Sequence, residues 1–445
     1  MTSCVEAQER MDTFEAEVSA LSHDGRGIAR VSGKAVFVAG VLPGERARLR
    51  TTRRHRQYDE AALVELLDQS PDRVEPRCPH FGTCGGCTLQ HLAPRAQLAA
   101  KQRVLADNLE RIGKLKPRHW LEPVTGSEWG YRRKGRLSVK WVEKKGRVLV
   151  GFRERDPRYV ADLSVCHTLV PEVGNRIREL AALLGSLEAR ASIPQIEIAA
   201  SDDVIALTFR HLQPLGESDR AALLEFGRSR NLAILLQPGG ADSVVPLWPE
   251  SLRLAYTIAG QGVELEFEPL DFVQVNGGVN AKMVALAIEL LAVDPGDRVL
   301  DLFCGIGNFT LPLARLAADV TGVEGEVALV ARARANAARN GIDNARFHAA
   351  DLATDQRASA WAQQPYDRIL LDPPRSGAAA VLDCVAGDAV KRIVYVSCHP
   401  AALARDAGEL VARHGFVLDA AGVLDMFPHT AHVESVASFI RAGDG

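Results

Sequence analysis

The sequence predicts an α/β protein in which a C-terminal Rossmann-like domain follows an N-terminal β-barrel and a central α+β domain. Residues 299–310 combine a short apolar run with a glycine turn and a helix-like continuation, which is typical of a parallel strand that enters a nucleotide-binding turn. Residues 299–398 contain five strand-like runs, and each carries a polar or reactive side chain at its carboxyl end. Between residues 14 and 67, short alternating runs are separated by glycine-bearing turns, a pattern that indicates a small barrel.

The C-terminal runs place several chemical groups at one edge of the predicted sheet. Gly305 and Gly307 let the backbone of the first turn come close to a ligand that a side chain would push away. No Gly-Lys-Ser/Thr follows, which excludes a phosphate loop, and Thr310 occupies the third glycine position of a dinucleotide fingerprint. Ligands of open α/β sheets bind at the carboxyl ends of the strands, where Glu324 suits the two hydroxyls of a ribose. The later runs end at Asp351, Asp372 and Cys398.

Length and composition predict two or three domains in a cytoplasmic chain. The 445 residues are 47% hydrophobic and 24% charged, and they contain no apolar run of transmembrane length and no signal peptide. We therefore expect a cytoplasmic location and no membrane partner. Eight cysteines in a reducing compartment favour metal binding or catalysis over disulfide bonds. The expected parts are a flexible tail at 1–12, a barrel at 13–70, a central domain at 75–270 and a catalytic domain at 271–445.

The charge is distributed unevenly along the chain. Residues 1–150 contain 27 lysine and arginine residues against 18 aspartate and glutamate residues, whereas the remainder contains 26 against 38. A basic front half indicates either a bound polyanion or an ordinary solvated surface, and both interpretations stay open. Arginines within 46–56 suit phosphate contacts. A second basic run at 132–136, flanked by aromatic residues, suits stacked single-stranded bases and equally suits a half-buried strand with a charged outer face.

Three cysteines within ten residues indicate a metal site. Cys78, Cys84 and Cys87 lie in a glycine-rich stretch, and soft thiolates select zinc or an iron–sulfur cluster. Their C-x5-C-x2-C spacing lacks the paired knuckles of zinc ribbons and differs from the C-x3-C-x2-C spacing of radical enzymes that use S-adenosylmethionine. Cys166 is the candidate for a fourth ligand. A group of stray reduced thiols is the alternative.

Two further segments adjoin the catalytic half. Residues 93–112 have an amphipathic pattern, and we expect the helix there to pack on the catalytic domain. Residues 272–276 precede the helix that leads to the first Rossmann strand, and they place Gln274 close to the glycine turn. Residues 170–265 contain no chemical motif.

Over nearly its whole length the chain resembles the RNA uracil-C5 methyltransferases that use S-adenosyl-L-methionine. The barrel resembles the TRAM domain, an RNA-binding barrel, notably in residues 23–30. Together with the four cysteines, it looks like the branch of the family that methylates 23S ribosomal RNA. The transfer-RNA branch is similar in its catalytic half but typically lacks both additions. The motifs that carry the resemblance are residues 301–310, Glu324, residues 372–377, residues 397–400 and residues 432–436.

The resemblance implies covalent catalysis on a pyrimidine. The thiolate of Cys398 would add to C6 of uracil, so that C5 gains enolate character and accepts a methyl group. Glu434 would then remove the C5 proton. The resemblance also implies cofactor contacts at Gln274, Phe303, Asn308, Glu324, Asp351 and Asp372.

The resemblance further implies an iron–sulfur cofactor and a nucleic-acid partner. A [4Fe-4S] cluster would be held by Cys78, Cys84, Cys87 and Cys166, with a structural or RNA-positioning role because methyl transfer involves no electron transfer. The implied partner is 23S ribosomal RNA, bound by a monomer.

Simpler roles remain open for several of these residues. A cysteine at a strand end is often buried packing, which is how we interpret Cys304, and Glu434 alone is compatible with a surface ion pair. The Asp372-Pro-Pro motif also resembles one that grips an exocyclic amine, and amino-group methylation predicts no role for Cys398. Arg375 stands where cytosine-C5 enzymes carry cysteine, which favours uracil. A transfer-RNA uracil-C5 methyltransferase and a non-catalytic RNA-binding ribosome-assembly factor also stay open as functions of the whole chain.

Overall fold

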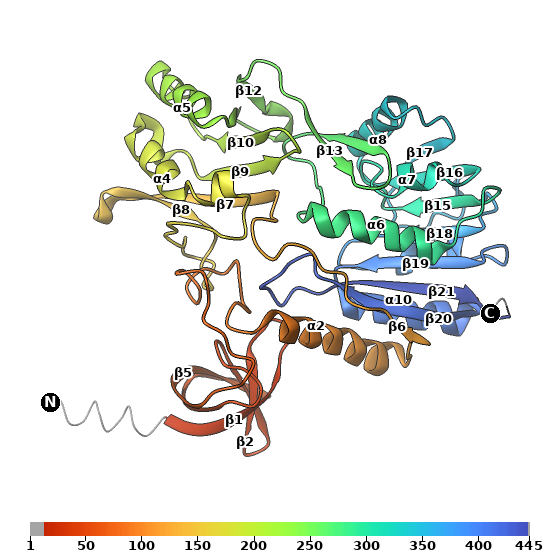
Figure 1. Ribbon diagram of the computed structural model, residues 1–445, viewed down its shortest axis with the longest axis horizontal. Helices are drawn as coiled ribbons and strands as arrows, with labels where there is room; N and C mark the ends of the chain where they lie inside the picture. The colour runs from red at the N-terminus through yellow and green to blue at the C-terminus, as the bar shows by residue number, and fades with distance from the viewer. Residues whose placement is uncertain (1–12, 444–445) are drawn as a thin grey trace. The chain divides into compact units, whose positions relative to one another are not determined.

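The computed structural model describes residues 13–443, which fall into two compact units (Figure 1). The first unit contains the described chain up to Lys101 together with Arg153–Ala161 and Pro428–His432. The second contains Gln102–Phe152, Asp162–Phe427 and the described chain from Val433 onward. The tail predicted at residues 1–12 lies outside the described residues. Within residues 13–443, no helix is both long enough and apolar enough to span a membrane.

A closed five-stranded barrel forms the core of the first unit and confirms the predicted barrel. Alternation along the strands buries Val18, Val36 and Leu49 inside the barrel. On its outer face, Arg48 forms ion pairs with Glu15 and Glu65. The strands follow the order β1-β2-β3-β5-β4 and are β1 (Thr13–Leu21), β2 (Gly27–Val31), β3 (Lys34–Val38), β4 (Arg46–Arg54) and β5 (Tyr58–Asp68).

The cysteine loop, residues 78–87, is held in the first unit by a segment distant in sequence. The backbone N–H of Gly85 donates to the carbonyl of Arg153 at 2.9 Å, and the backbones of Cys84 and Glu154 form an isolated antiparallel β-bridge. A Cβ at Gly85 would lie 3.0 Å from the carbonyl oxygens of Arg153 and Glu154, so only glycine permits this approach. The loop is therefore fixed by tertiary contacts rather than by regular secondary structure.

The predicted amphipathic helix extends from α2 (Pro94–Asn108) into a π-helical turn, η1 (Leu109–Gly113). Within the second unit, Leu105 and Leu109 are buried in one cluster with Leu403 of α10 (Pro400–His414). Gly113 lies against the backbone of α10 so closely that a side chain would clash with it.

The second unit contains a six-stranded sheet, and most of the basic run at 132–136 is engaged by partners within the protein. Arg133 pairs with Asp202 at 2.7 Å, Arg136 pairs with Glu197, and Lys134 donates to the carbonyl of Pro269. These contacts favour a half-buried strand over an open base-stacking surface. The sheet has the order β12-β11-β10-β9-β7-β8, with β7 (Lys134–Val142), β8 (Arg147–Gly151), β9 (Gln195–Ala200), β10 (Ile205–Arg210), β11 (Ala233–Gln237) and β12 (Val245–Trp248).

Short helices and a hairpin complete this part of the unit. The helical segments are η2 (Glu143–Lys145), α3 (Pro171–Gly174), α4 (Ile177–Ser186), η3 (Glu188–Ala191), α5 (Glu217–Arg230) and η4 (Ala241–Ser243). The hairpin consists of β13 (Leu254–Ile258) and β14 (Val263–Phe267). It shares an apolar cluster with residues of the glycine turn and of the eight-stranded catalytic sheet.

The catalytic sheet has eight strands in the order β17-β16-β15-β18-β19-β21-β20-β6. Five adjacent strands are parallel, as the sequence predicts, and β21 then inserts antiparallel between β19 and β20. The two-residue strand β6 pairs in parallel with β20 and forms the edge of the eight-stranded sheet beyond it. The strands are β6 (His119–Trp120), β15 (Arg298–Leu302), β16 (Asp319–Glu324), β17 (Ala345–Ala349), β18 (Arg368–Leu371), β19 (Arg392–Ser397), β20 (Phe416–Leu424) and β21 (Glu434–Arg441).

Apolar clusters bury both faces of this sheet. One cluster joins the sheet to α6 (Gly277–Leu291), α7 (Thr310–Ala314) and α8 (Val327–Arg339). The other joins it to α9 (Ala379–Val385), α10 and η1. Because both faces are covered, the carboxyl ends of the parallel strands are the part of the sheet where polar side chains gather.

Candidate active site

The glycine turn after β15 has the backbone conformation expected of a ligand-binding turn. Phe303, Gly305 and Gly307 have φ values of +65°, +55° and +99°, and Phe303 is therefore a non-glycine residue in the left-handed region. Such a conformation persists only where its surroundings hold it. The backbone N–H of Phe303 donates to the carbonyl of Val323 at 2.8 Å, which ties the turn to β16.

Glu324 links this turn to the next one. One carboxylate oxygen accepts from the N–H of Gly305 at 3.1 Å, and the other accepts from the N–H groups of Gly325 and Glu326 at 2.7 and 3.1 Å. The carboxylate therefore lies beside the glycine turn, at the carboxyl end of β16. This is the location in which an acid binds a ribose in Rossmann-type sheets.

Asn308, a predicted cofactor residue, is held by two side chains that the sequence interpretation missed. Asn280 and Asn308 exchange amide hydrogen bonds of 2.9 and 3.0 Å, and the hydroxyl of Tyr256 donates to Asn308 at 3.2 Å. Asn280 lies on α6, whose first turn follows the loop that carries the half-buried Gln274. Asn280 is the fourth residue of that helix, and its polar side chain among apolar neighbours was the available signal.

Asp301 supports the turn from beneath. It is fully buried on β15 and accepts a hydrogen bond of 2.5 Å from the hydroxyl of Thr310. Burial, followed by the nearby charges of Asp372 and Glu324, raises the pKa of Asp301 to about 8. The hydrogen bond from Thr310 opposes this rise in pKa. The same bond links Asp301 on β15 to Thr310 at the start of α7 and so joins the two ends of the glycine turn.

Cys398 and Glu434 are brought together by the antiparallel pairing of β19 and β21. Ser397 pairs with Ser435, so the next positions along the two strands, Cys398 and Glu434, stand opposite each other. The Cys398 thiol is half-buried, whereas Glu434 is only 5% exposed. The two residues are 36 positions apart in sequence, and neighbouring strands make them adjacent.

Nearby charges contribute to the pKa values of Cys398 and Glu434. Burial raises the pKa of Glu434 to about 8, with the charge of Asp372 adding to the effect and that of Arg375 opposing it. Burial also raises the pKa of Asp372 to about 7. The pKa of the Cys398 thiol rises to about 11, first because of burial and then because of the charges of Glu434 and Asp372. A cysteine, two carboxyls and an arginine therefore share one electrostatic environment.

The loop that carries Asp372 and Arg375 is anchored by a buried aspartate on α10. Asp406 is fully buried and accepts hydrogen bonds of 2.7 Å from the hydroxyl of Tyr395 and from the N–H of Ala378. Gly377 has a φ of +84° and lies against the side chain of Asp406, so the loop requires glycine there. Asp406 and Tyr395 position the loop but have no sequence motif of their own.

The remaining predicted residues lie in separate settings. Asp351 is exposed, two residues beyond β17, and its carboxylate accepts from the N–H of Ala353 at 3.0 Å. Cys304 is buried within the glycine turn against Gly322, and burial raises the pKa of its thiol well above the usual value.

The four candidate cluster ligands come from two segments of the chain. Cys78, Cys84 and Cys87 are half-buried in the cysteine loop of the first unit, where the N–H of Gly86 donates to the sulfur of Cys84 at 3.4 Å. Cys166 is buried in the second unit, with its sulfur 3.3 Å from the hydroxyl of Thr168. Four cysteine sulfurs, one of them already accepting a backbone N–H, are a donor set whose chemistry fits an iron–sulfur cluster.

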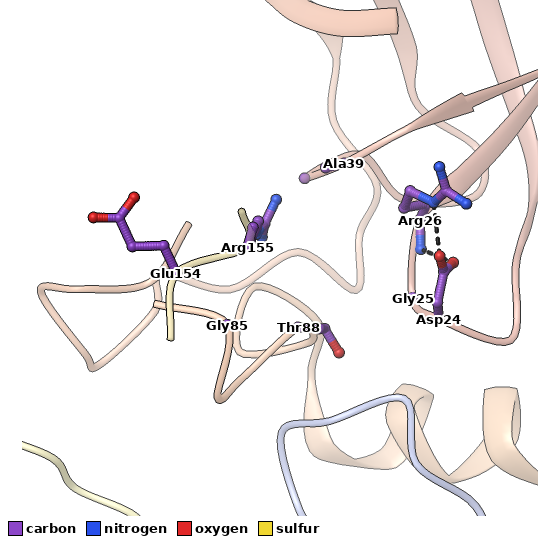
Figure 2. Close-up of a pocket in the computed structure, with 9 residues that line it drawn as sticks. Asp24, Gly25, Arg26, Ala39, Gly85, Thr88, Glu154 and Arg155 are labelled. Atoms are coloured by element: carbon purple, nitrogen blue, oxygen red, sulfur yellow. Dashed lines mark hydrogen bonds and ion pairs between the residues drawn. The ribbon is translucent and has the colours of Figure 1, made fainter. Parts of the chain in front are cut away.

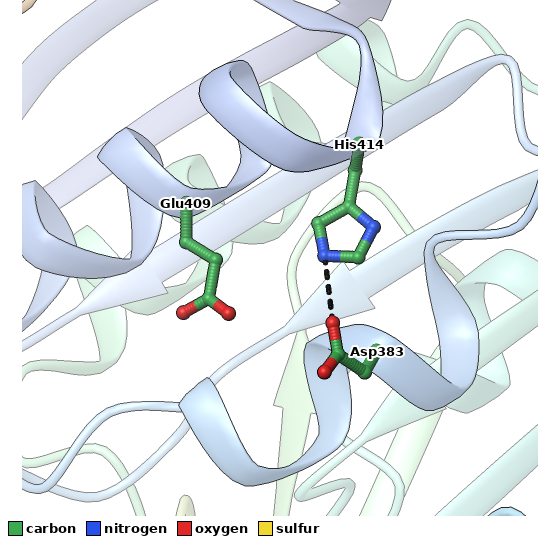
Figure 3. A group of neighbouring side chains, drawn as sticks. All are labelled: Asp383, Glu409 and His414. Atoms are coloured by element: carbon green, nitrogen blue, oxygen red, sulfur yellow. Dashed lines mark ion pairs between the residues drawn. The ribbon is translucent and has the colours of Figure 1, made fainter.

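Asp383, Glu409 and His414 form a further polar group near the end of α10 (Figure 3). The Nε2 atom of His414 lies 3.2 Å from Asp383. Arg413 pairs with both carboxylates, and its contact with Asp383 is 3.1 Å. Because the arginine already neutralises the acids, this group is a surface ion-pair network.

Comparison with known proteins identifies both parts of the chain. A family model described as tRNA (Uracil-5-)-methyltransferase matches residues 96–441, and the TRAM domain model matches residues 7–64. The 23S rRNA (uracil(1939)-C(5))-methyltransferase RlmD of Xanthomonas euvesicatoria pv. vesicatoria (strain 85-10) is 58% identical over 431 residues, which cover 96% of this chain and 97% of that protein. RlmD of Xylella fastidiosa (strain 9a5c) is 58% identical over 439 residues, which cover 98% and 99%.

A solved structure shares the fold over almost the same extent. The Pyrococcus abyssi tRNA (uracil-54, C5)-methyltransferase, crystallised with S-adenosyl-L-homocysteine, superimposes with a TM-score of 0.73 at 23% identity. The match covers 96% of this chain and 99% of that structure.

Proposed function

Because the chain belongs to the tRNA (uracil-5-)-methyltransferase family and is an enzyme that uses S-adenosyl-L-methionine, we propose that it methylates C5 of one uridine in 23S ribosomal RNA. The ribosomal substrate is the one named for the relatives of 58% identity, and these relatives share almost the whole chain, including the barrel. The observation that supports the chemistry is the β19–β21 register, which sets Ser397 opposite Ser435 and so brings the half-buried thiol that follows β19 to the buried carboxyl at the start of β21.

Cys398 is the nucleophile in this mechanism. Its proton passes to solvent, to which the half-buried thiol has access, and the sulfur forms a bond to C6 of the uracil. The electron pair of the C5–C6 double bond moves toward the O4 carbonyl, so that C5 becomes an enolate carbon. S-adenosyl-L-methionine would supply a methyl group on a positively charged sulfur. The nucleophilic C5 would form a bond to this methyl carbon, and the electrons of the broken sulfur–methyl bond would remain on sulfur, so that S-adenosyl-L-homocysteine leaves as a neutral thioether.

Glu434 completes the reaction as the base. Its carboxylate takes the proton from C5, the C5–C6 double bond forms again, and the bond from C6 to Cys398 breaks with its electrons returning to sulfur. A pKa of about 8 suits this task, because a group that titrates near the working pH both accepts and releases a proton readily. The target base must leave its stack to reach these groups.

The cofactor residues follow from the glycine turn. We propose that Glu324 holds the ribose hydroxyls and that Phe303, Asn308 and Asp372 line the rest of the site, with Gln274 and Asp351 at its margins. The support is that the carboxylate of Glu324 bonds the N–H of Gly305 and that Asn280 and Tyr256 orient Asn308.

We also propose that Cys78, Cys84, Cys87 and Cys166 hold a [4Fe-4S] cluster. The donor set supports it, because four thiolates are the ordinary ligand set of such a cluster. The cluster would supply rigid covalent cross-links, and no step of the methyl transfer requires it. Iron and acid-labile sulfide analysis of anaerobically purified protein tests this, and zinc without sulfide would contradict it.

The covalent step is tested with a 23S rRNA fragment containing 5-fluorouridine at the target. Fluorine at C5 cannot leave as a proton, so the wild-type enzyme should remain bonded to the RNA through Cys398 after methyl transfer. The adduct is measured by denaturing gel and by mass spectrometry of the attached peptide. Cys398→Ser should form no adduct, whereas Cys384→Ser, which alters a free cysteine on α9, should form as much as the wild type. An adduct in the Cys398→Ser protein would contradict the mechanism.

A further inference from the structure

The first unit contains a cavity of about 400 Å³ that none of the predicted site residues lines (Figure 2). Its walls come from the turn between β1 and β2, the turn after β3, the cysteine loop with Thr88, and residues 154–155. Sites for small ligands commonly measure about 300–1,000 Å³, so the space suits one nucleotide.

Two arginines line this cavity, and they differ in their ion pairs. Arg26 is neutralised, because it bonds Asp24 at 2.8 Å and approaches Glu60 at 3.5 Å. Arg155 is exposed and has no ion pair within residues 13–443, and its guanidinium lies 5.8 Å from the centre of the Phe81 ring. Figure 2 shows the carboxylate of Glu154 pointing away from the Arg155 side chain. The cavity therefore presents one cation that no acid neutralises.

The position of Arg155 depends on the cysteine loop. Its backbone N–H donates to the carbonyl of Thr83 at 3.2 Å. Two residues earlier, the carbonyl of Arg153 accepts from the N–H of Gly85, which belongs to the same loop. The Phe81 ring that lies under the guanidinium also belongs to the loop. The loop thus fixes the backbone at Arg155 and places an aromatic ring beside its guanidinium.

From this arrangement we infer that the cavity binds one nucleotide of a single-stranded segment of the substrate RNA, with a backbone phosphate paired to Arg155. This inference rests on the proposed function, because the RNA is the proposed substrate. A ribonucleic acid is favoured over a free anion because one wall is the barrel that matches the TRAM domain. Contacts of this kind set affinity and register and read no sequence. The cysteine loop then acts by placing a phosphate-binding arginine.

The test compares two arginines of the same segment. Arg155→Gln should weaken binding of the 23S rRNA fragment about tenfold, the usual size for one charge-assisted hydrogen-bonded contact. The slope of log affinity against log salt should fall by about 0.7, the value for one phosphate of a single strand. KM for the RNA should rise with kcat unchanged. Arg158→Gln is the matched control, because Arg158 is paired with Asp156 and does not line the cavity.

Binding is measured by fluorescence anisotropy at several salt concentrations, and Arg155→Lys, which keeps the charge, should retain most of the affinity. Equal losses for Arg155→Gln and Arg158→Gln would overturn the inference, since the effect would then be general charge. Arg155-dependent binding of uridine 5′-monophosphate with unchanged RNA affinity would also overturn it in favour of a small-anion site. The binding assay needs no methyl transfer, so wild-type protein that binds RNA without methylating it would remove the proposed function alone.

Discussion

Replacing Glu434 with glutamine should stabilise the protein at alkaline pH, because the buried site destabilises the carboxylate form. The same substitution should stop turnover, because the proposed reaction needs that carboxylate as a base. Glu434 is 5% exposed, and burial together with the charge of Asp372 raises its pKa from 4.5 to about 8. Glutamine has a similar shape and no charge. The substitution therefore removes the ionisation and leaves the packing of β21 nearly unchanged.

The sign and size follow from the two pKa values. Below pH 4.5 the carboxyl is protonated in both the folded and the unfolded chain, so it costs no stability. As the pH rises, the unfolded chain loses the proton first, and the free energy of unfolding falls by about 1.4 kcal/mol per pH unit until the pH passes the folded-state pKa. The cost is on the order of 3 kcal/mol at pH 7 and reaches its full size above pH 8.

Thermal unfolding between pH 4.5 and 8.5 measures this effect. Relative to wild type, Glu434→Gln should melt on the order of 5 °C higher at pH 8 and at the same temperature at pH 4.5. Glu289→Gln, at an exposed position on α6, is the control for a glutamate-to-glutamine change in general. If Glu434→Gln and wild type share one pH profile, the burial argument is refuted.

Turnover of the same variant tests the role of the base. The rate of methylation should fall by about 100-fold or more, because general-base catalysis contributes at least that much. The covalent RNA adduct should accumulate, since methyl transfer is possible but the C5 proton stays in place. A rate within about threefold of wild type would refute the assignment of Glu434.

Three further substitutions test other parts of the structure. Asn280→Ala should raise KM for S-adenosyl-L-methionine about tenfold with little change in kcat, because Asn308 loses its amide partner, and titration calorimetry measures the affinity directly. Gly377→Ala should cost about 1–3 kcal/mol in denaturant unfolding, whereas Gly296→Ala, where a methyl group meets open space, should be nearly neutral. Cys166→Ser should lower the iron and sulfide content, and Cys384→Ser should not; unchanged content in Cys166→Ser would exclude it as a ligand.

Much of the fold was predictable because its signals are local. A parallel strand buried on both faces reads as a continuous apolar run, and the five runs of the C-terminal half are the five parallel strands. The barrel was predictable because alternating runs between glycine turns are a property of neighbouring residues. Glu324 and Asp372 were recognisable as candidates because they end such runs. Their roles, like those of Cys398 and Glu434, stay predictions that the substitutions and the RNA adduct test.

Other features depend on contacts that no local pattern encodes. Asn280 and Tyr256 support Asn308 from 28 and 52 residues away, and Asp406 anchors a loop 28 residues before it. The basic run at 132–136 was ambiguous in sequence, and acids distant in the chain, such as Asp202, decided its outcome.

The sequence by itself determined which residues carry reactive groups and which segments become strands, because backbone preference and apolar period are set by near neighbours. Only the tertiary structure decided that β21 enters the sheet antiparallel beside β19 and so sets Glu434 opposite Cys398. It likewise left Arg155 without an acid partner within residues 13–443, beside a cavity. Strand register and charge neutralisation depend on which distant segments pack together, and that is settled by the free energy of the whole core.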